Sequence, residues 1–141
     1  TWTFLDNISS MKGNVSIELT EHCCEFDPAD GADALQTYIS NMKSKGFSLA
    51  FDDIGSGQNN FELISKNVQN IHTIKISLLD FRNTNEDSMF FSLNNWLNFS
   101  NRYNLKMVVE GVESECISNK LKNLGMVYQQ GYYHGKGQVL C

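Results

Sequence analysis

The chain has no basic stripe and no long apolar run, and these absences exclude two classes of protein. Its 141 residues carry 11 Lys and Arg against 16 Asp and Glu, for a net charge of -5. A protein that binds the phosphate backbone needs clustered positive charge, so we expect no DNA or RNA partner. No apolar run approaches the roughly 20 residues of a membrane-spanning helix, and no charged and apolar leader precedes Thr1. We therefore expect a soluble protein.

Cysteine and proline are also scarce. Cys23, Cys24, Cys116 and Cys141 form no C-x-x-C pair, lack the spacing of a zinc site, and include two adjacent residues that are poorly placed for bridging. This usage predicts free thiols in a reducing cytoplasm. Pro28, the single proline, marks no domain boundary, and no repeat or linker interrupts the chain. We predict one domain, or part of one.

Short apolar runs alternate with segments of helical periodicity. The runs cover residues 15–19, 47–51, 73–76, 105–109 and 126–129. Leu35, Ile39 and Met42 recur at helical spacing before Gly46, and similar segments lie around residues 61–64, 89–97 and 117–124. The stretch 82–87 offers N-caps for the third helix. The runs are nearly continuously apolar, which is typical of parallel strands covered on both faces, so we predict an α/β barrel or doubly wound sheet.

Polar residues lie near or directly beyond the C-terminal end of each run. They are Glu18, Asp52, Asp53, Lys75, Glu110 and Gln130. Parallel barrels build their active sites at the C-terminal ends of their strands. Adjacent carboxylates point to opposite faces of a strand, so Asp52 and Asp53 can share a site only where the strand gives way to the loop at Gly55-Ser56-Gly57. Their mutual repulsion favours a cation such as Mg²⁺ or Mn²⁺, and this set of residues suits two-metal hydrolysis of a phosphoester.

Each of these residues also has a structural interpretation. The acidic pair could be a solvated loop or a helix cap, and Lys75 could be a surface or ion-pair lysine. Glu110 could pair with a lysine on a neighbouring strand, and the side chain of Gln130 could be satisfied by the backbone. The coincidence at successive strand ends favours the functional interpretation.

Five segments resemble, in order, the motifs of the EAL domain, a family of bacterial phosphodiesterases of cyclic di-GMP. They are Glu18-Leu19-Thr20-Glu21, Asp52-Asp53-Ile54-Gly55-Ser56-Gly57, Lys75-Ile76-Ser77, Glu110-Gly111-Val112-Glu113 and Gln130-Gly131-Tyr132. The family pattern reads E-L-T-E, D-D-F-G-T-G, K-I-D, E-G-V-E and Q-G-Y. The resemblance covers essentially the whole chain and implies a (β/α) TIM-type barrel.

The resemblance also implies roles for the matched residues. Glu18, Asp52, Asp53 and Glu110 resemble metal ligands for Mg²⁺ or Mn²⁺. Lys75 resembles the residue that holds the catalytic water, and Gln130 resembles one that supports the site. Lys75, Glu110 and Gln130 are thus the expected catalytic residues. Glu21 and Glu113 correspond to glutamates that steady the loop 54–60, which the family uses for homodimer contacts. The implied reaction opens cyclic di-GMP to linear pGpG by attack of a metal-activated water.

Two family features are absent from the chain. The signature Glu-Ala-Leu segment and the asparagine ligand of the next strand have no counterpart before Glu18. A complete barrel takes roughly 250 residues, so we expect residues 1–141 to be the C-terminal portion of an EAL barrel, with about five parallel strands. The isolated chain is expected to show no hydrolysis, and two copies could associate to cover their open strand edges.

Ser77 stands where the K-I-D motif has aspartate, and serine replaces threonine at Ser56. These changes keep a second hypothesis open, namely a degenerate EAL module that binds cyclic di-GMP or a protein partner without catalysis. A third, an unrelated metal-dependent barrel enzyme, would also place carboxylates at strand ends, although the E-G-V-E and Q-G-Y segments oppose it.

Overall fold

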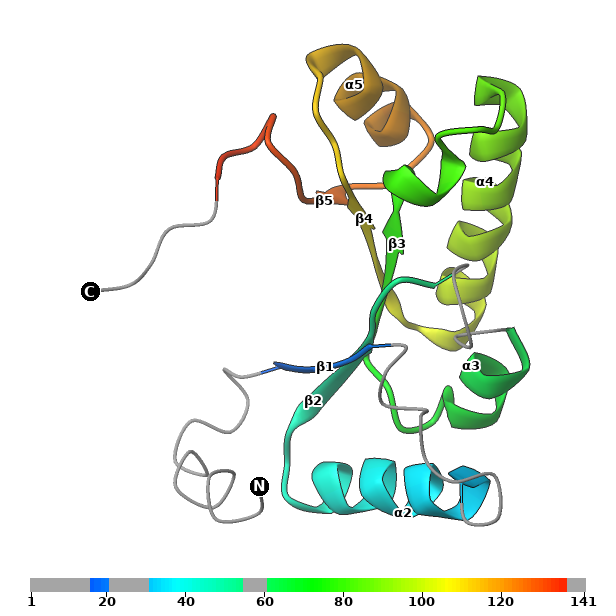
Figure 1. Ribbon diagram of the computed structural model, residues 1–141, viewed down its shortest axis with the longest axis vertical. Helices are drawn as coiled ribbons and strands as arrows, with labels where there is room; N and C mark the ends of the chain where they lie inside the picture. Colours follow the sequence, from blue (N-terminus) through cyan, green and yellow to red (C-terminus); the bar gives the residue numbers. More distant parts are fainter. Residues whose placement is uncertain (1–15, 21–30, 55–60, 137–141) are drawn as a thin grey trace. The chain divides into compact units, whose positions relative to one another are not determined.

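The computed structural model describes residues 16–20, 31–54 and 61–136. The chain divides into two compact units, Thr1–Thr73 and Ile74–Cys141. Within the described ranges, five strands alternate with helices, as predicted (Figure 1). Among the described residues, no helix combines the length and the apolar character that crossing a membrane requires.

The described residues of the first unit form two strands and two helices. In chain order they are β1 (Ser16–Leu19), α2 (Gly31–Ser44), β2 (Ser48–Phe51) and α3 (Phe61–Asn67). β1 and β2 are parallel, with Ser16 opposite Ser48 and Leu19 opposite Phe51. Helix α2 contacts β2, and its buried residues Leu35, Ile39 and Met42 have the spacing expected of one helix face.

Helix α2 ends where the sequence predicted. Gly46 has a φ of +82°, a left-handed conformation that glycine adopts without steric cost, and its N–H donates to Lys43 O at 2.9 Å. The Lys43 Nζ then donates to the carbonyl of Gln69 and, at 3.3 Å, to Asn70 Oδ1. This lysine therefore ties the end of α2 to the segment that leads into the next strand.

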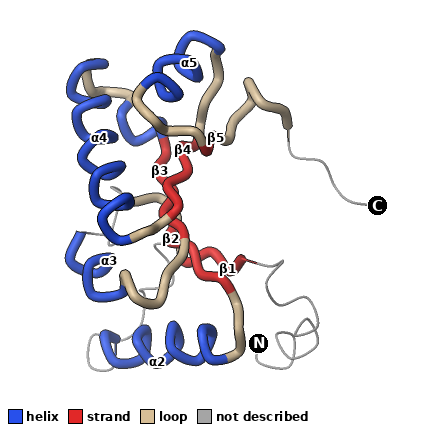
Figure 2. The backbone as a smooth tube through the Cα atoms, turned by 180° about the vertical axis from the view of Figure 1, so that it is seen from behind, coloured by secondary structure: helices blue, strands red, loops and turns tan. Residues whose placement is uncertain are grey.

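In the second unit, the residues that the structure describes form three strands, two α-helices and one 3₁₀-helix. In chain order they are β3 (Thr73–Ser77), η3 (Leu78–Phe81), α4 (Glu86–Tyr103), β4 (Lys106–Glu110), α5 (Glu115–Asn123) and β5 (Tyr128–Gln129). β4 and β5 are parallel, with Val109 opposite Gln129. Helix α4 runs beside β3 and β4 in both views (Figures 1 and 2). The Lys106 ammonium lies 4.7 Å from the centre of the Tyr128 ring, which joins the starts of β4 and β5.

Helix α4 follows its predicted caps and period. Asn85 is the N-cap, and its Oδ1 accepts the Ser88 N–H at 2.8 Å. Leu93 is fully buried, while Met89 and Trp96 on the same apolar stripe are half-buried. A left-handed residue, Asn104, with a φ of +56°, ends the helix before β4.

Two local features differ from the sequence-based expectation. The 3₁₀-helix η3 has no counterpart in the predicted elements, because four residues are too few to show a period. The fifth strand is also shorter than predicted. Met126 does not belong to it, since its N–H donates back to Leu121 O at 2.9 Å and so caps helix α5.

Candidate active site

In the first unit, three acidic residues lie at the C-terminal ends of β1 and β2. Glu18 is the penultimate residue of β1, has an exposed side chain and lies opposite Ala50 of β2. The Asp52 N–H donates to Leu19 O at 3.0 Å, which continues the parallel pairing one residue past the end of β2. The pairing of β1 with β2 therefore sets the position of Asp52 beside the end of β1.

The carboxylates of Asp52 and Asp53 converge, although successive residues of a regular strand point to opposite faces. Asp53 has a φ of +50°, in the left-handed region that aspartate tolerates better than most residues. Its N–H donates to Asp52 Oδ1 at 3.0 Å, and one carboxylate oxygen of each residue lies within 4.8 Å of the other. Both side chains offer hard carboxylate oxygens as metal ligands, so this pair fits Mg²⁺ or Mn²⁺ chemically.

In the second unit, Lys75 of β3 and Glu110 of β4 form an ion pair between neighbouring strands. The Lys75 Nζ lies 2.8 Å from Glu110 Oε1, and the two side chains are only 9% and 18% exposed. Burial of an ammonium group is costly unless a charge or hydrogen-bond partner compensates it. The alternative in which Glu110 pairs with a lysine of a neighbouring strand is thus what the structure shows.

This pairing is compatible with a role at a metal site. The carboxylate of Glu110 has a second oxygen and further lone pairs, so one oxygen can contact Lys75 while the group serves as a ligand. The ammonium group also places a positive charge and hydrogen-bond donors at the C-terminal end of β4. Such a group can hold a water molecule or a phosphate oxygen.

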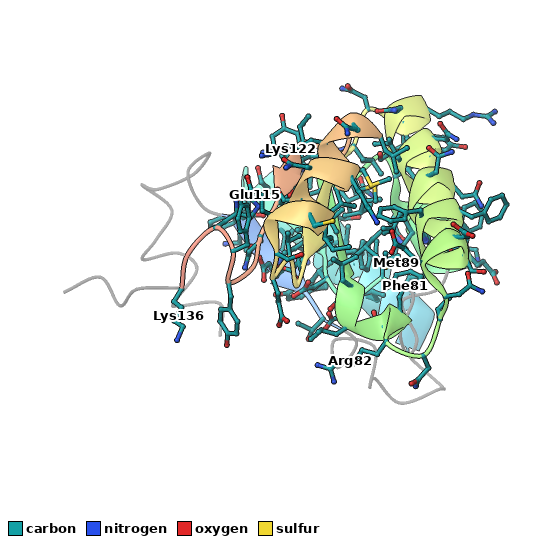
Figure 3. All side chains as sticks on the ribbon, turned by 90° about the horizontal axis from the view of Figure 1, so that it is seen from above. Phe81, Arg82, Met89, Glu115, Lys122 and Lys136 are labelled. Carbon is teal, nitrogen blue, oxygen red and sulfur yellow. The ribbon has the colours of Figure 1, made fainter. Side chains whose placement is uncertain are left out.

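Gln130 contacts the segment around Glu110 through its backbone. Its side chain is exposed, whereas its N–H donates to Val109 O at 2.9 Å and its carbonyl accepts the Val112 N–H at 3.1 Å. A cavity of about 410 Å³ lies at this end of β5, lined by residues 129–132 and 134–136. The Lys136 side chain at its margin points away from helix α5 (Figure 3).

Sequence reasoning missed the neighbouring residue Gln129. Its Nε2 donates to Ser118 O at 3.1 Å and to Met126 O at 2.9 Å, and its Oε1 lies 3.2 Å from His134 Nε2. The adjacent pair Gln129 and Gln130 was a usable signal, because successive residues within a strand point to opposite faces. The first of them ties β5 to α5.

Of the remaining predicted site residues, Glu113 is described by the structure and the others are not. Glu113 is exposed in the loop between β4 and α5. Ser77 is buried, and its Oγ accepts the Leu79 N–H at 3.3 Å, so it caps η3. Four predicted residues lie outside the described part of the chain, namely Glu21, Gly55, Ser56 and Gly57.

Comparison with known proteins yields a family match and several relatives. The family model of the EAL domain matches residues 3–137. Cyclic di-GMP phosphodiesterase TpdA of Vibrio parahaemolyticus is 26% identical over 121 residues, which are 85% of this chain and 20% of TpdA. Cyclic di-GMP phosphodiesterase PdeA of Borreliella burgdorferi is 27% identical over 127 residues, which are 90% of this chain and 18% of PdeA. This chain therefore spans about a fifth of each curated relative.

Solved structures agree with the predicted fold. The c-di-GMP-bound form of a standalone EAL protein from Vibrio cholerae O395 has a TM-score of 0.71 at 27% identity, covering 94% of this chain and 54% of that one. The EAL domain of Mycobacterium smegmatis DcpA also has a TM-score of 0.71, at 22% identity, covering 96% of this chain and 62% of that one. The prediction of a partial (β/α) barrel is confirmed by these matches.

Proposed function

Because this chain belongs to the EAL domain family, we propose that the protein hydrolyses cyclic di-GMP to linear pGpG with water activated by a divalent metal. The observation that carries the proposal is the convergence of the Asp52 and Asp53 carboxylates directly after β2, within the family's second motif. Two relatives named as cyclic di-GMP phosphodiesterases match most of the chain, which supports the same substrate.

We propose Glu18, Asp52, Asp53 and Glu110 as metal ligands. A divalent cation bound by such a set would activate water and stabilise the leaving oxygen of the phosphoester. Lys75, paired with Glu110 at 2.8 Å, would hold that water or a phosphate oxygen through its ammonium hydrogens. Gln130 would support the site through its backbone contacts on both sides of Glu110.

We further propose that residues 1–141 are the C-terminal portion of the EAL barrel and that further ligands come from its earlier strands. The coverage of 54% and 62% of the two solved structures supports this assignment. The protein would use Mg²⁺ or Mn²⁺, act in the cytoplasm and form a homodimer. Sedimentation velocity of the complete protein tests the last point, and a strictly monomeric profile at high concentration would contradict it.

One observation favours a second function, the binding of cyclic di-GMP without turnover. Ser77 occupies the position of the aspartate in the family's third motif, and its buried side chain caps η3. Serine carries no charge, so Lys75 lacks the negative charge that the aspartate of the family motif would place two residues after it. In this case the complete protein would act as a sensor of the dinucleotide.

The decisive experiment follows cyclic di-GMP and pGpG by chromatography with the complete protein, Mn²⁺ and a metal-free control. We expect pGpG from the unaltered protein and its loss in Glu110→Gln. Glu115→Gln is the matched control, because Glu115 is an exposed acid in the first turn of α5. Binding of cyclic di-GMP without pGpG would establish the sensor, and the absence of both binding and turnover would overturn both functions.

A further inference from the structure

The backbone around Glu110 is held on both sides by one residue of the neighbouring strand. The Gln130 N–H donates to Val109 O at 2.9 Å, before Glu110, and the Gln130 carbonyl accepts the Val112 N–H at 3.1 Å, after it. Glu110 and Gly111 are therefore enclosed between two main-chain hydrogen bonds to Gln130. A displacement of Gln130 changes both anchor points of Glu110 together.

Gly131, which follows Gln130, lies directly against the same backbone. A Cβ atom at Gly131 would lie 2.3 Å from Val112 O, 2.4 Å from Val112 N and 2.8 Å from Val112 C. Backbone atoms cannot move aside as the end of a flexible side chain does. Val112 is buried, and its carbonyl also accepts the Tyr133 N–H at 3.1 Å, so both sides of this residue are engaged.

Gly111, the residue after Glu110, lies beside η3. It has a φ of +72°, and a Cβ atom there would meet Leu79 Cγ at 3.6 Å and the Leu78 backbone nitrogen at 3.7 Å. The segment 110–112 thus passes between η3 on one side and the turn after β5 on the other. The Glu110 carboxylate, at the start of this segment, lies 2.8 Å from Lys75 Nζ.

We propose that Gly131 is a positioning residue for Glu110, and that its lack of a side chain keeps the Glu110 carboxylate in contact with Lys75. Any larger residue would push Val112 and Gln130 apart, break their hydrogen bond and move the end of β4. The consequence for metal binding rests on the proposed function, in which Glu110 is a ligand. The consequence for the ion pair does not.

The test compares Gly131→Ala with Gly135→Ala in the complete protein. Gly135 has a φ of +134°, close to the φ of +153° at Gly131, but nothing lies within 4 Å of a Cβ atom placed there. Both variants therefore introduce an alanine at a strained backbone position, and only Gly131→Ala introduces the collision with Val112. The difference between them isolates the contact from the strain.

The first readout is the ¹H–¹⁵N signal of the Lys75 ammonium in the absence of metal, with Glu110→Gln as the reference for a lost ion pair. We expect Gly131→Ala to move this signal toward that of Glu110→Gln, and Gly135→Ala to leave it unchanged. The second readout is the calorimetric affinity for Mn²⁺. We expect Gly131→Ala to weaken it about 10-fold to 100-fold, the usual effect of disturbing a residue that orients a ligand.

An unchanged Lys75 signal and Mn²⁺ affinity in a folded Gly131→Ala protein would overturn the proposal. A shifted Lys75 signal in a protein whose unaltered form binds no Mn²⁺ would support the positioning role and refute the metal site. If Gly131→Ala does not fold, the hydrogen-exchange rate of the Val112 amide in the unaltered protein tests the arrangement instead. The Val112 amide is expected to exchange as slowly as the amides of β4, and exchange at the rate of an open loop would refute the arrangement.

Discussion

Separating Lys75 from Glu110 tests whether this ion pair stabilises the second unit. Their charged atoms lie 2.8 Å apart, and at an effective dielectric constant of about 20 the attraction is about 6 kcal/mol before desolvation. Desolvation of both groups offsets much of that energy. Removing one partner from a buried pair costs about 3–5 kcal/mol, and the 18% exposure of Glu110 places this pair near the lower limit.

We expect Lys75→Met and Glu110→Gln each to lower the free energy of unfolding by about 3 kcal/mol, because each leaves its partner in a poorly solvated position. The double variant is expected to cost no more than either single variant, which is about 3 kcal/mol less than their sum, since it leaves no uncompensated charge. The measurement is urea unfolding of the full chain in the presence of a chelator, so that metal binding does not contribute.

The chain offers a matched control for this experiment in Lys66 and Glu62. Their charged atoms lie at nearly the same distance, 2.7 Å, but their side chains are 68% and 73% exposed. Solvent screening should make their coupling much smaller than that of Lys75 and Glu110. Additivity of the Lys75 and Glu110 variants within about 0.5 kcal/mol would contradict a stabilising role for this ion pair, because it would mean that burial adds nothing to the pair.

Three further predictions concern single sites. Asp53→Asn should weaken Mn²⁺ binding by the complete protein at least about 10-fold, because asparagine lacks the charge of aspartate. The circular dichroism spectrum should not change, because asparagine tolerates the φ of +50°. Equal Mn²⁺ affinity by calorimetry would remove Asp53 from the ligand set. Asn85→Ala should lower the free energy of unfolding by about 1 kcal/mol through loss of the cap on Ser88 N–H, and an unchanged urea midpoint would contradict that cap. The hydrogen bond from Lys66, and then its charge, hold the pKa of Glu62 below its ordinary value of 4.5. Their contribution to stability is therefore present above pH 4.5 and lost as the pH falls through the lowered pKa, so Lys66→Gln should raise that pKa in an NMR titration and flatten this acid dependence.

Local chemistry in the sequence was enough to predict the order of elements. The spacing of Leu35, Ile39 and Met42 describes one buried helix face, and Gly46 with a φ of +82° ends that helix. Asn85 caps the next long helix as its position before the apolar stripe predicted. These features depend on residues within one or two turns of each other, which is why the sequence reveals them.

The candidate site could be predicted only in part. The position of Asp52 and Asp53 after an apolar run predicted that they would meet where the strand becomes a loop, and the left-handed conformation of Asp53 is the means. The EAL motifs predicted which family the chain belongs to, and the family match confirms it. The metal ligands and the role of Lys75 remain predictions for the experiments above.

The tertiary structure alone decided how the residues of the second unit act on one another. The contact of Lys75 with Glu110 depends on which strands are neighbours and in what register, and neither is encoded in the spacing along the chain. Gln130 was singled out for its side chain, whereas the structure shows its backbone holding Val109 and Val112. Short-range patterns identify residue types and elements, but a hydrogen bond or a collision between distant segments exists only after the chain has folded.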